Sequence, residues 1–109
     1  MDKRRVWIGN MIYMFDLDGT LFDTEISTYD KPIPDEAMIT LVNMLYDQGH
    51  TIKIFTARGS SSGIDYRDRT EKQLKEFGVK YHELIFGKPS ADVIIDDISM
   101  TPEEFLNEV

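Results

Sequence analysis

Short apolar runs alternate with longer amphipathic stretches along this chain. The apolar runs occupy residues 11–15, 51–55, 84–86 and 93–95, and continuous runs of this length are typical of strands that are buried on both faces of a sheet. Strands that alternate with helices of about ten residues pair in parallel through right-handed crossovers. The pattern therefore predicts an α/β fold with a three-layer parallel sheet of about four strands.

The amphipathic stretches are predicted to be helices with recognisable starts. One begins after Asp35, a candidate N-cap, and carries apolar residues at positions i, i+3, i+4 and i+7. A second begins near Asp65 with a similar period. A third begins at Thr101, where Glu104 completes a capping box.

The composition is that of one globular domain spanning residues 1–109, because 41% of the residues are hydrophobic and 29% are charged. The absence of cysteine excludes a disulfide framework, a thiolate zinc site and a cysteine nucleophile. His50 and His82 stand alone, and we interpret both as structural residues. No apolar run is long enough to span a bilayer, and no signal peptide is predicted at the N-terminus. The sequence therefore predicts a cytoplasmic protein.

The net charge of −8 limits the partners that the surface attracts. A surface of this sign repels nucleic acid and anionic membranes, so we expect neither as a partner. A phosphorylated substrate is repelled as well, unless a cation offsets the acidic residues of the site. If the acidic residues act on phosphate, the charge balance predicts a bound metal ion.

Two acidic residues fall where a ligand site is expected. Asp16 and Asp18 follow the first predicted strand, and in open α/β sheets ligands bind at the carboxyl ends of the strands. Two carboxylates held this close raise one pKa or recruit a cation. An Asp-Gly turn alone is weak evidence of a site. A calcium loop needs glycine at its sixth position and an acid at its twelfth, where this chain has Leu21 and Ser27, so that alternative is excluded.

Further polar groups follow the other predicted strands. Thr56, together with nearby backbone N–H groups and Gly59, is suited to hold phosphate oxygens. Lys88 precedes a proline and is suited to neutralise charge on an aspartate and a phosphate. Asp96 and Asp97 end the last predicted strand, and hard carboxylate oxygens of this kind suit Mg²⁺. Together these groups predict a phosphate site with a bound magnesium ion.

The order Asp-x-Asp-x-Thr, Thr, Lys and Asp-Asp, each at a predicted strand end, resembles the haloacid dehalogenase-like (HAD) phosphatases over residues 11–97. The resemblance implies a Rossmann-like sheet and a Mg²⁺-dependent phosphatase that hydrolyses a phosphate monoester. It implies that Asp16 is the nucleophile that forms an aspartyl-phosphate and that Asp18 is the general acid/base. Thr56 matches the phosphate-orienting hydroxyl, and Lys88 matches the charge-stabilising lysine.

The resemblance also implies a set of four acidic metal ligands. They are Asp16, Asp18, Asp96 and Asp97. In the family the residue at the position of Asp18 binds the metal through its backbone carbonyl. The resemblance leaves open which of Asp96 and Asp97 binds directly.

No cap domain is expected, because only residues 21–34 and 60–87 separate the motifs. The site should then be open, unless a second subunit of a homo-oligomer covers it, with residues 22–31 as a short flap beside it. Phe22, Tyr29 and Tyr66 are interpreted as packing residues.

The substrate is expected to be a small phosphorylated molecule. A looser resemblance to phosphatases of capsular or surface polysaccharide synthesis, in residues 56–59, 78–82 and 87–92, implies a sugar phosphate. Substrate contacts are expected from residues next to the phosphate site: Gly19, Thr20, Ala57 and Arg58.

Two alternatives stay open at this point. A response-regulator-like phosphoacceptor domain also uses Asp, Thr, Lys and an acidic pair around Mg²⁺, although its acidic pair comes on the first strand and its phosphoacceptor on a middle one. A phosphatase of a phosphoprotein or a nucleotide would also suit an open site. A non-catalytic domain finds no support, because every motif residue is present.

Overall fold

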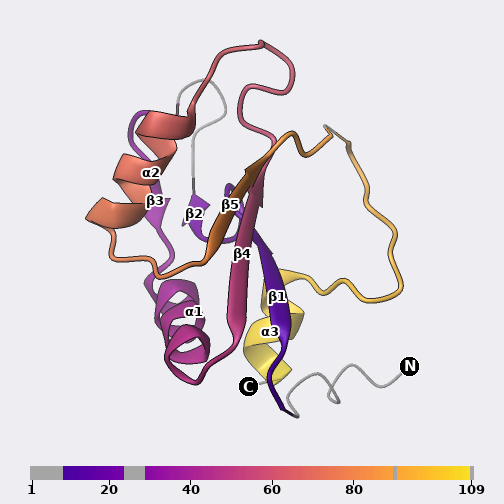
Figure 1. The fold of residues 1–109 in the computed structure, drawn as a ribbon. Helices are drawn as coiled ribbons and strands as arrows, with labels where there is room; N and C mark the ends of the chain where they lie inside the picture. The colour runs from indigo at the N-terminus through magenta and orange to yellow at the C-terminus, as the bar shows by residue number, and fades with distance from the viewer. Residues whose placement is uncertain (1–8, 24–28, 90, 109) are drawn as a thin grey trace.

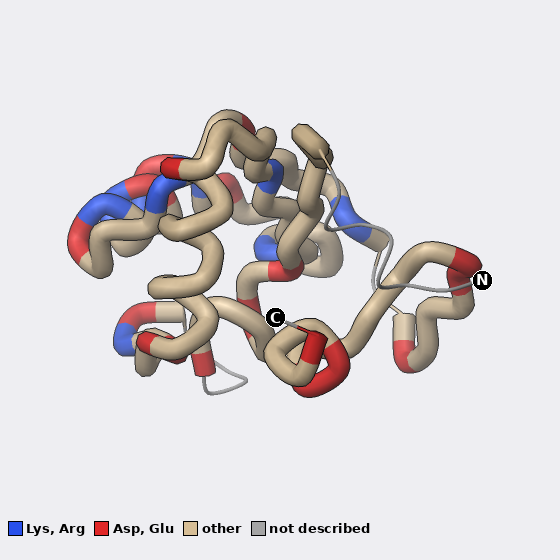
Figure 2. The backbone as a smooth tube through the Cα atoms, turned by 90° about the horizontal axis from the view of Figure 1, so that it is seen from below, with Lys and Arg blue, Asp and Glu red and all other residues tan. Residues whose placement is uncertain are grey.

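The computed structural model describes residues 9–23, 29–89 and 91–108. These residues form a parallel sheet, a short antiparallel pair of strands and three helices, arranged as in Figure 1. The elements follow one another as β1 (Ile12–Asp16), β2 (Phe22–Asp23), β3 (Ile33–Pro34), α1 (Glu36–Asp47), β4 (Thr51–Thr56), α2 (Arg67–Glu76), β5 (Glu83–Phe86) and α3 (Pro102–Glu108). Figure 2 shows that charged positions of both signs are spread over several segments, so the net charge of −8 is not gathered in one cluster.

The parallel sheet has the strand order β1-β4-β5, with β4 in the middle. β1 pairs with β4 up to Asp16 opposite Phe55, and β4 pairs with β5 up to Thr56 opposite Phe86. The three strands run in the same direction and end nearly level. Their ends therefore form one edge of the sheet, which we call the carboxyl edge.

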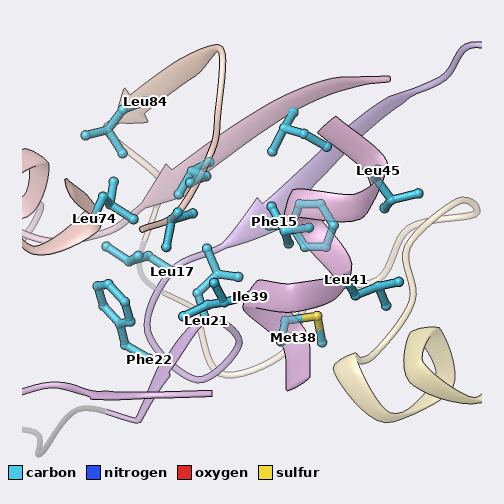
Figure 3. Close-up of a cluster of buried hydrophobic side chains, with 14 of the residues drawn as sticks. Phe15, Leu17, Leu21, Phe22, Met38, Ile39, Leu41, Leu45, Leu74 and Leu84 are labelled. Carbon is cyan, nitrogen blue, oxygen red and sulfur yellow. The ribbon is translucent and has the colours of Figure 1, made fainter. Parts of the chain in front are cut away.

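All three helices cover the same face of this sheet. Side chains alternate along a strand, so Phe15 of β1 and its register partner Ile54 of β4 point to one side, as does Leu84 of β5. Phe105 of α3 contacts the Phe15 ring, with 5.4 Å between the ring centroids. Leu74 of α2 and the buried residues of α1 complete the same core (Figure 3).

The opposite face of the sheet is left uncovered by the described elements. Ile12 is 66% exposed and Met14 is 54% exposed on this face. The predicted three-layer arrangement is therefore wrong for the described part of the chain, which forms two layers. The reason is topological, because the crossovers from β1 to β4 and from β4 to β5 step across the sheet in the same direction. Right-handed crossovers that step one way place their helices on one face.

The last predicted strand, at residues 93–95, is not formed. This stretch swings out beside β1 and returns to α3 (Figure 1), and Ile95 is 94% exposed. Within residues 9–23, 29–89 and 91–108 the parallel sheet therefore has three strands and not about four. A β-branched run forms a strand only where a neighbouring strand supplies hydrogen bonds and a face for packing. Among the described residues this run pairs with no strand, although Ile94 lines a cavity with Met14 and Phe55.

The other predicted strands and all predicted helices are confirmed, with ends that shift by a residue or two. Asp35 caps α1, since its Oδ1 accepts the N–H of Met38 at 3.0 Å. The capping box of α3 is formed by reciprocal bonds of 3.1 Å between Thr101 and Glu104. These contacts satisfy N–H groups that have no partner inside the helix.

The two histidines are structural, as predicted. His50 Nδ1 accepts the N–H of Met11 at 2.9 Å, and His82 Nδ1 accepts the N–H of Ile52 at 3.0 Å. Both bonds tie the start of a strand to the segment beside it.

The described part of the chain holds no cap domain and no helix that is long and apolar enough to cross a membrane. The predicted flap lies partly outside the described residues, at 24–28, as does the N-terminal stretch 1–8. Within the flap, Phe22 is buried, and the Tyr29 ring packs on Tyr66 with 5.1 Å between centroids. The packing roles predicted for these three residues are confirmed.

Candidate active site

Asp16 and Lys88 meet at the carboxyl edge. Asp16 is the last residue of β1, and Lys88 lies in the loop after β5. Lys88 Nζ lies 3.2 Å from Asp16 Oδ1 and 4.7 Å from the centroid of the Phe55 ring. The Lys88 side chain is 17% exposed and that of Asp16 is 33% exposed, so water screens this pair less than a surface pair. The structure thus brings together the predicted nucleophile and the predicted lysine.

The turn after β1 is closed by its own backbone. The Leu17 carbonyl accepts the N–H groups of Thr20 at 3.3 Å and of Phe22 at 3.1 Å, and the Gly19 N–H donates to the Phe22 carbonyl at 2.7 Å. Gly19 has a φ of 90°, which glycine adopts without strain. The backbone N–H groups of Gly19 and Thr20 are therefore bonded within the turn, and the predicted substrate contacts of these residues stay predictions.

Arg58 forms a buried, bidentate ion pair with Asp18. Its Nε donates to Asp18 Oδ2 at 2.9 Å and its Nη2 donates to Asp18 Oδ1 at 2.8 Å, the fork geometry that strengthens such pairs. Its Nη1 donates to Thr70 Oγ1 at 3.1 Å and to Gln73 Oε1 at 2.7 Å, both on α2. The Arg58 side chain is 0% exposed. This geometry contradicts the predicted contact between Arg58 and a substrate, because burial commits the guanidinium to Asp18 and α2.

The loop after β4 is tied to the loop that carries Lys88. Thr56 is buried, and its Oγ1 accepts the N–H of Arg58 at 3.1 Å. The Ala57 carbonyl accepts the N–H of Ser60 at 2.9 Å, and Ser60 Oγ donates to the Lys88 carbonyl at 2.9 Å. The Lys88 N–H in turn donates to the Thr56 carbonyl at 3.2 Å. Thr56 and Ala57 therefore organise this loop, and their predicted contacts with a substrate stay predictions.

Asp96 and Asp97 lie apart from the other acidic residues of the predicted site. Both are exposed in the stretch that does not form the predicted strand. The N–H of Ile98 donates to Asp96 Oδ1 at 3.2 Å. This bond, followed by the interaction with Asp97, lowers the pKa of Asp96 below its ordinary value.

The acidic residues of the predicted magnesium site do not gather in one place among the described residues. Among the described residues, no three His, Cys, Asp or Glu side chains gather closely enough to hold a metal ion. Asp18 is already bound by Arg58, and Lys88 already places a positive charge beside Asp16. Mg²⁺ demands near-octahedral oxygen coordination at about 2.0–2.1 Å. The predicted set of Asp16, Asp18, Asp96 and Asp97 is therefore not assembled, and Mg²⁺ remains a prediction from the sequence.

A cavity of about 240 Å³ opens beside the loop after β4. Its walls include Asp65, Tyr66, Arg67 and Phe86. The Arg67 guanidinium lies over the Phe86 ring, 4.7 Å from its centroid. Charged groups of both signs beside aromatic rings suit a ligand that carries an apolar ring face and polar substituents.

Thr70 and Gln73 are site residues that the sequence analysis does not single out. Thr70 lies on the buried side of α2, and Gln73 precedes the buried Leu74. Both are buried, and buried polar side chains require hydrogen-bond partners. Polar residues on the inner side of a helix are the sequence signal that could have pointed to the Arg58 pair.

Comparison with known proteins bears on the fold. No family model matches this chain, and no curated protein matches it. The chain is similar to a crystal structure of an MCSG target from Vibrio cholerae, with a TM-score of 0.79 and 28% identical residues. The match covers 88% of this chain and 87% of that one. The two proteins therefore share a compact α/β fold over most of their lengths.

Proposed function

We propose that this protein is an HAD-like phosphatase that hydrolyses a phosphate monoester at Asp16. The observation that carries the proposal is the Asp16–Lys88 pair, with Nζ 3.2 Å from Oδ1 at the carboxyl edge of a parallel sheet. Ligands of open α/β sheets bind at this edge. The pair supplies a nucleophile for phosphorus and a positive charge for the phosphoryl oxygens.

The proposed reaction has two steps. First, an Asp16 carboxylate oxygen attacks the phosphorus, the bond from phosphorus to the leaving oxygen breaks, and an aspartyl-phosphate forms. Lys88 offsets the negative charge on the transferring phosphoryl group. In the second step a water oxygen attacks the phosphorus and the bond to Asp16 breaks. Inorganic phosphate leaves and the Asp16 carboxylate is restored.

Asp18 is proposed to manage the protons of both steps. It receives a proton from solvent before the first step, gives that proton to the leaving oxygen, and later takes one from the attacking water. Asp18 lies two residues after Asp16, and its side chain is 26% exposed, which supports a role next to a substrate bound at Asp16.

The proposed substrate is a sugar phosphate. The cavity next to the loop after β4 supports this choice, because its Asp65 and Arg67 offer polar contacts beside the ring of Phe86. A panel of sugar phosphates, nucleotides and a phosphopeptide would rank the classes by kcat/KM. A preference for a nucleotide or for the phosphopeptide would replace the sugar phosphate.

The proposal is tested by the Asp16→Asn variant. We expect kcat for 4-nitrophenyl phosphate to fall by about 10³-fold or more, because the amide cannot form the covalent intermediate. The control is Asp23→Asn, an exposed carboxylate at the end of β2, which should keep full activity. Unchanged turnover in Asp16→Asn, with an unaltered far-ultraviolet circular dichroism spectrum, would remove the covalent mechanism.

The magnesium prediction is tested separately by metal removal. We expect phosphate release from the unaltered protein to stop in EDTA and to return with added Mg²⁺. Release that EDTA leaves unchanged would contradict the prediction and would indicate that Lys88 alone offsets the charge at Asp16.

A phosphoacceptor switch is the alternative from another functional class. It predicts that acetyl phosphate labels Asp16 and that the label persists for minutes without turnover. Rapid loss of the label with release of phosphate favours the phosphatase.

A further inference from the structure

We infer that Arg58 is a positioning residue, which fixes the Asp18 carboxylate and acts on the reaction only through it. The inference rests on the proposed function, because it assigns Arg58 a part in the same site. Asp18 accepts hydrogen bonds on both of its oxygens, at 2.9 Å from Nε and 2.8 Å from Nη2 of Arg58. A bidentate pair fixes the plane of the carboxylate as well as its position.

The Arg58 guanidinium is itself held in place by contacts with α2 and with Tyr29. Thr70 and Gln73 accept hydrogen bonds from Nη1, so α2 sets the orientation of Arg58. The centroid of the Tyr29 ring lies 4.6 Å from the guanidinium carbon, and the Gln73 side-chain amide donates to the Tyr29 carbonyl. Arg58 is therefore fixed from three directions, and a fixed donor group determines where its acceptor lies.

The burial of Arg58 makes the pair with Asp18 necessary. A charge that is fully removed from water requires an opposite charge beside it. Among the described residues, the Arg58 guanidinium forms its ion pair with Asp18, whereas its partners on α2 are neutral. The Asp18 carboxylate therefore stays where Arg58 holds it.

The Arg58 side chain is 0% exposed, and this burial determines whether its loss is expected to change kcat or KM. A side chain without solvent exposure does not reach a substrate, so its loss should lower kcat and leave KM unchanged. A misplaced catalytic group loses about 100-fold in rate. We therefore expect Arg58→Gln to lower kcat by about 100-fold.

The experiment is a double-mutant cycle of Arg58→Gln and Asp18→Asn, with kcat and KM measured for 4-nitrophenyl phosphate. The inference expects Arg58→Gln to reduce kcat in the unaltered background and to have no further effect in the Asp18→Asn background. A purely structural role for Arg58 gives the same loss in both backgrounds and overturns the inference, as does a change confined to KM. No hydrolysis by the unaltered protein, with or without Mg²⁺, overturns the proposed function itself and this inference with it.

Two further variants keep the test decisive if Arg58→Gln does not fold, which its thermal melting curve will show. Thr70→Val removes one acceptor behind the guanidinium, and it should lower kcat less than Arg58→Gln but with the same dependence on Asp18. The matched control is Arg69→Gln, which loses an exposed pair with Asp30. Arg69→Gln should keep kcat unchanged, and equal losses in Thr70→Val and Arg69→Gln would overturn the inference.

Discussion

Lys88 is held close to Asp16 by its backbone as well as by its charge. Its N–H donates to the Thr56 carbonyl, and its carbonyl accepts from Ser60 Oγ. The ammonium also lies over the Phe55 ring, a contact that favours a cation. The positive charge is thus placed before a substrate arrives, and a charge placed in advance costs no reorganisation during the reaction.

Replacing Lys88 by methionine tests this role. Lys88→Met keeps the length of the side chain and removes its charge, so we expect kcat to fall by about 10²–10³-fold. Lys80→Met is the control, because Lys80 forms an exposed pair with Asp47 near the starts of β5 and β4, at the end of the sheet opposite the carboxyl edge. Equal activity of both variants would contradict the role of Lys88 in offsetting phosphoryl charge.

Two glycines of the loop after β4 allow a sharp test of its packing. Gly59 and Gly63 both have positive φ, at 81° and 75°. A Cβ on Gly59 would lie 2.1 Å from the Ile64 carbonyl oxygen, whereas a Cβ on Gly63 would meet nothing within 4 Å.

We expect Gly63→Ala to lower the free energy of unfolding by about 1 kcal/mol, the cost of alanine at positive φ. Gly59→Ala should cost about 2–5 kcal/mol, because the clash adds to the same backbone cost. Urea denaturation followed by circular dichroism measures both. Equal costs would indicate that Ile64 moves away from the added methyl group.

Some contacts between single residues of the site can be predicted from the sequence, and others cannot. The Asp16–Lys88 pair is predicted, because both residues follow apolar runs and parallel strands end at one edge. The pairing of Arg58 is not predicted, because its partners Thr70 and Gln73 come from a helix whose rotation about its axis depends on packing. Sequence spacing places a residue on a helix face but does not give the partner of a buried polar group.

At the scale of elements, three of the four predicted strands form, and each of them pairs with a neighbouring strand of the parallel sheet. The runs at 11–15, 51–55 and 84–86 become β1, β4 and β5, and their inner residues pack on helices. The run at 93–95 has an equally apolar composition and stays exposed. Composition therefore predicts that a segment suits a strand, but pairing decides whether it becomes one.

Limited proteolysis tests the placement of this stretch. Thermolysin cleaves before large apolar residues, and Val93, Ile94 and Ile95 are 72%, 58% and 94% exposed without regular hydrogen bonding. We expect the first cut between residues 91 and 99, identified by mass spectrometry. Ile64, at 56% exposure, is an internal control and should be cut more slowly, because its N–H is bonded to Ser62. Resistance of the 91–99 stretch would indicate that it pairs as a strand in solution, as the sequence predicts.

At the scale of the whole molecule, the net charge differs from the local charge balance around Asp16 and Asp18. The net charge of −8 predicts that a metal ion must offset the acidic site. In the described arrangement each of the two neighbouring carboxylates already has its own cation, Lys88 for Asp16 and Arg58 for Asp18. Composition gives the total charge of a protein, whereas the local balance depends on which side chains the fold brings together.

The central position of β4 also determines the order in which contacts form during folding and synthesis. Asp16 and Lys88 are 72 positions apart in the sequence, and they meet only because β1 and β5 both pair with β4. Contacts of such long range form late, because the intervening chain must be ordered first. During synthesis, a nascent chain that ends before β5 can pair β1 with β4 but lacks the lysine. Asp16 is therefore synthesised before its cation, and the two side chains meet only after β5 and the loop that carries Lys88 have emerged from the ribosome.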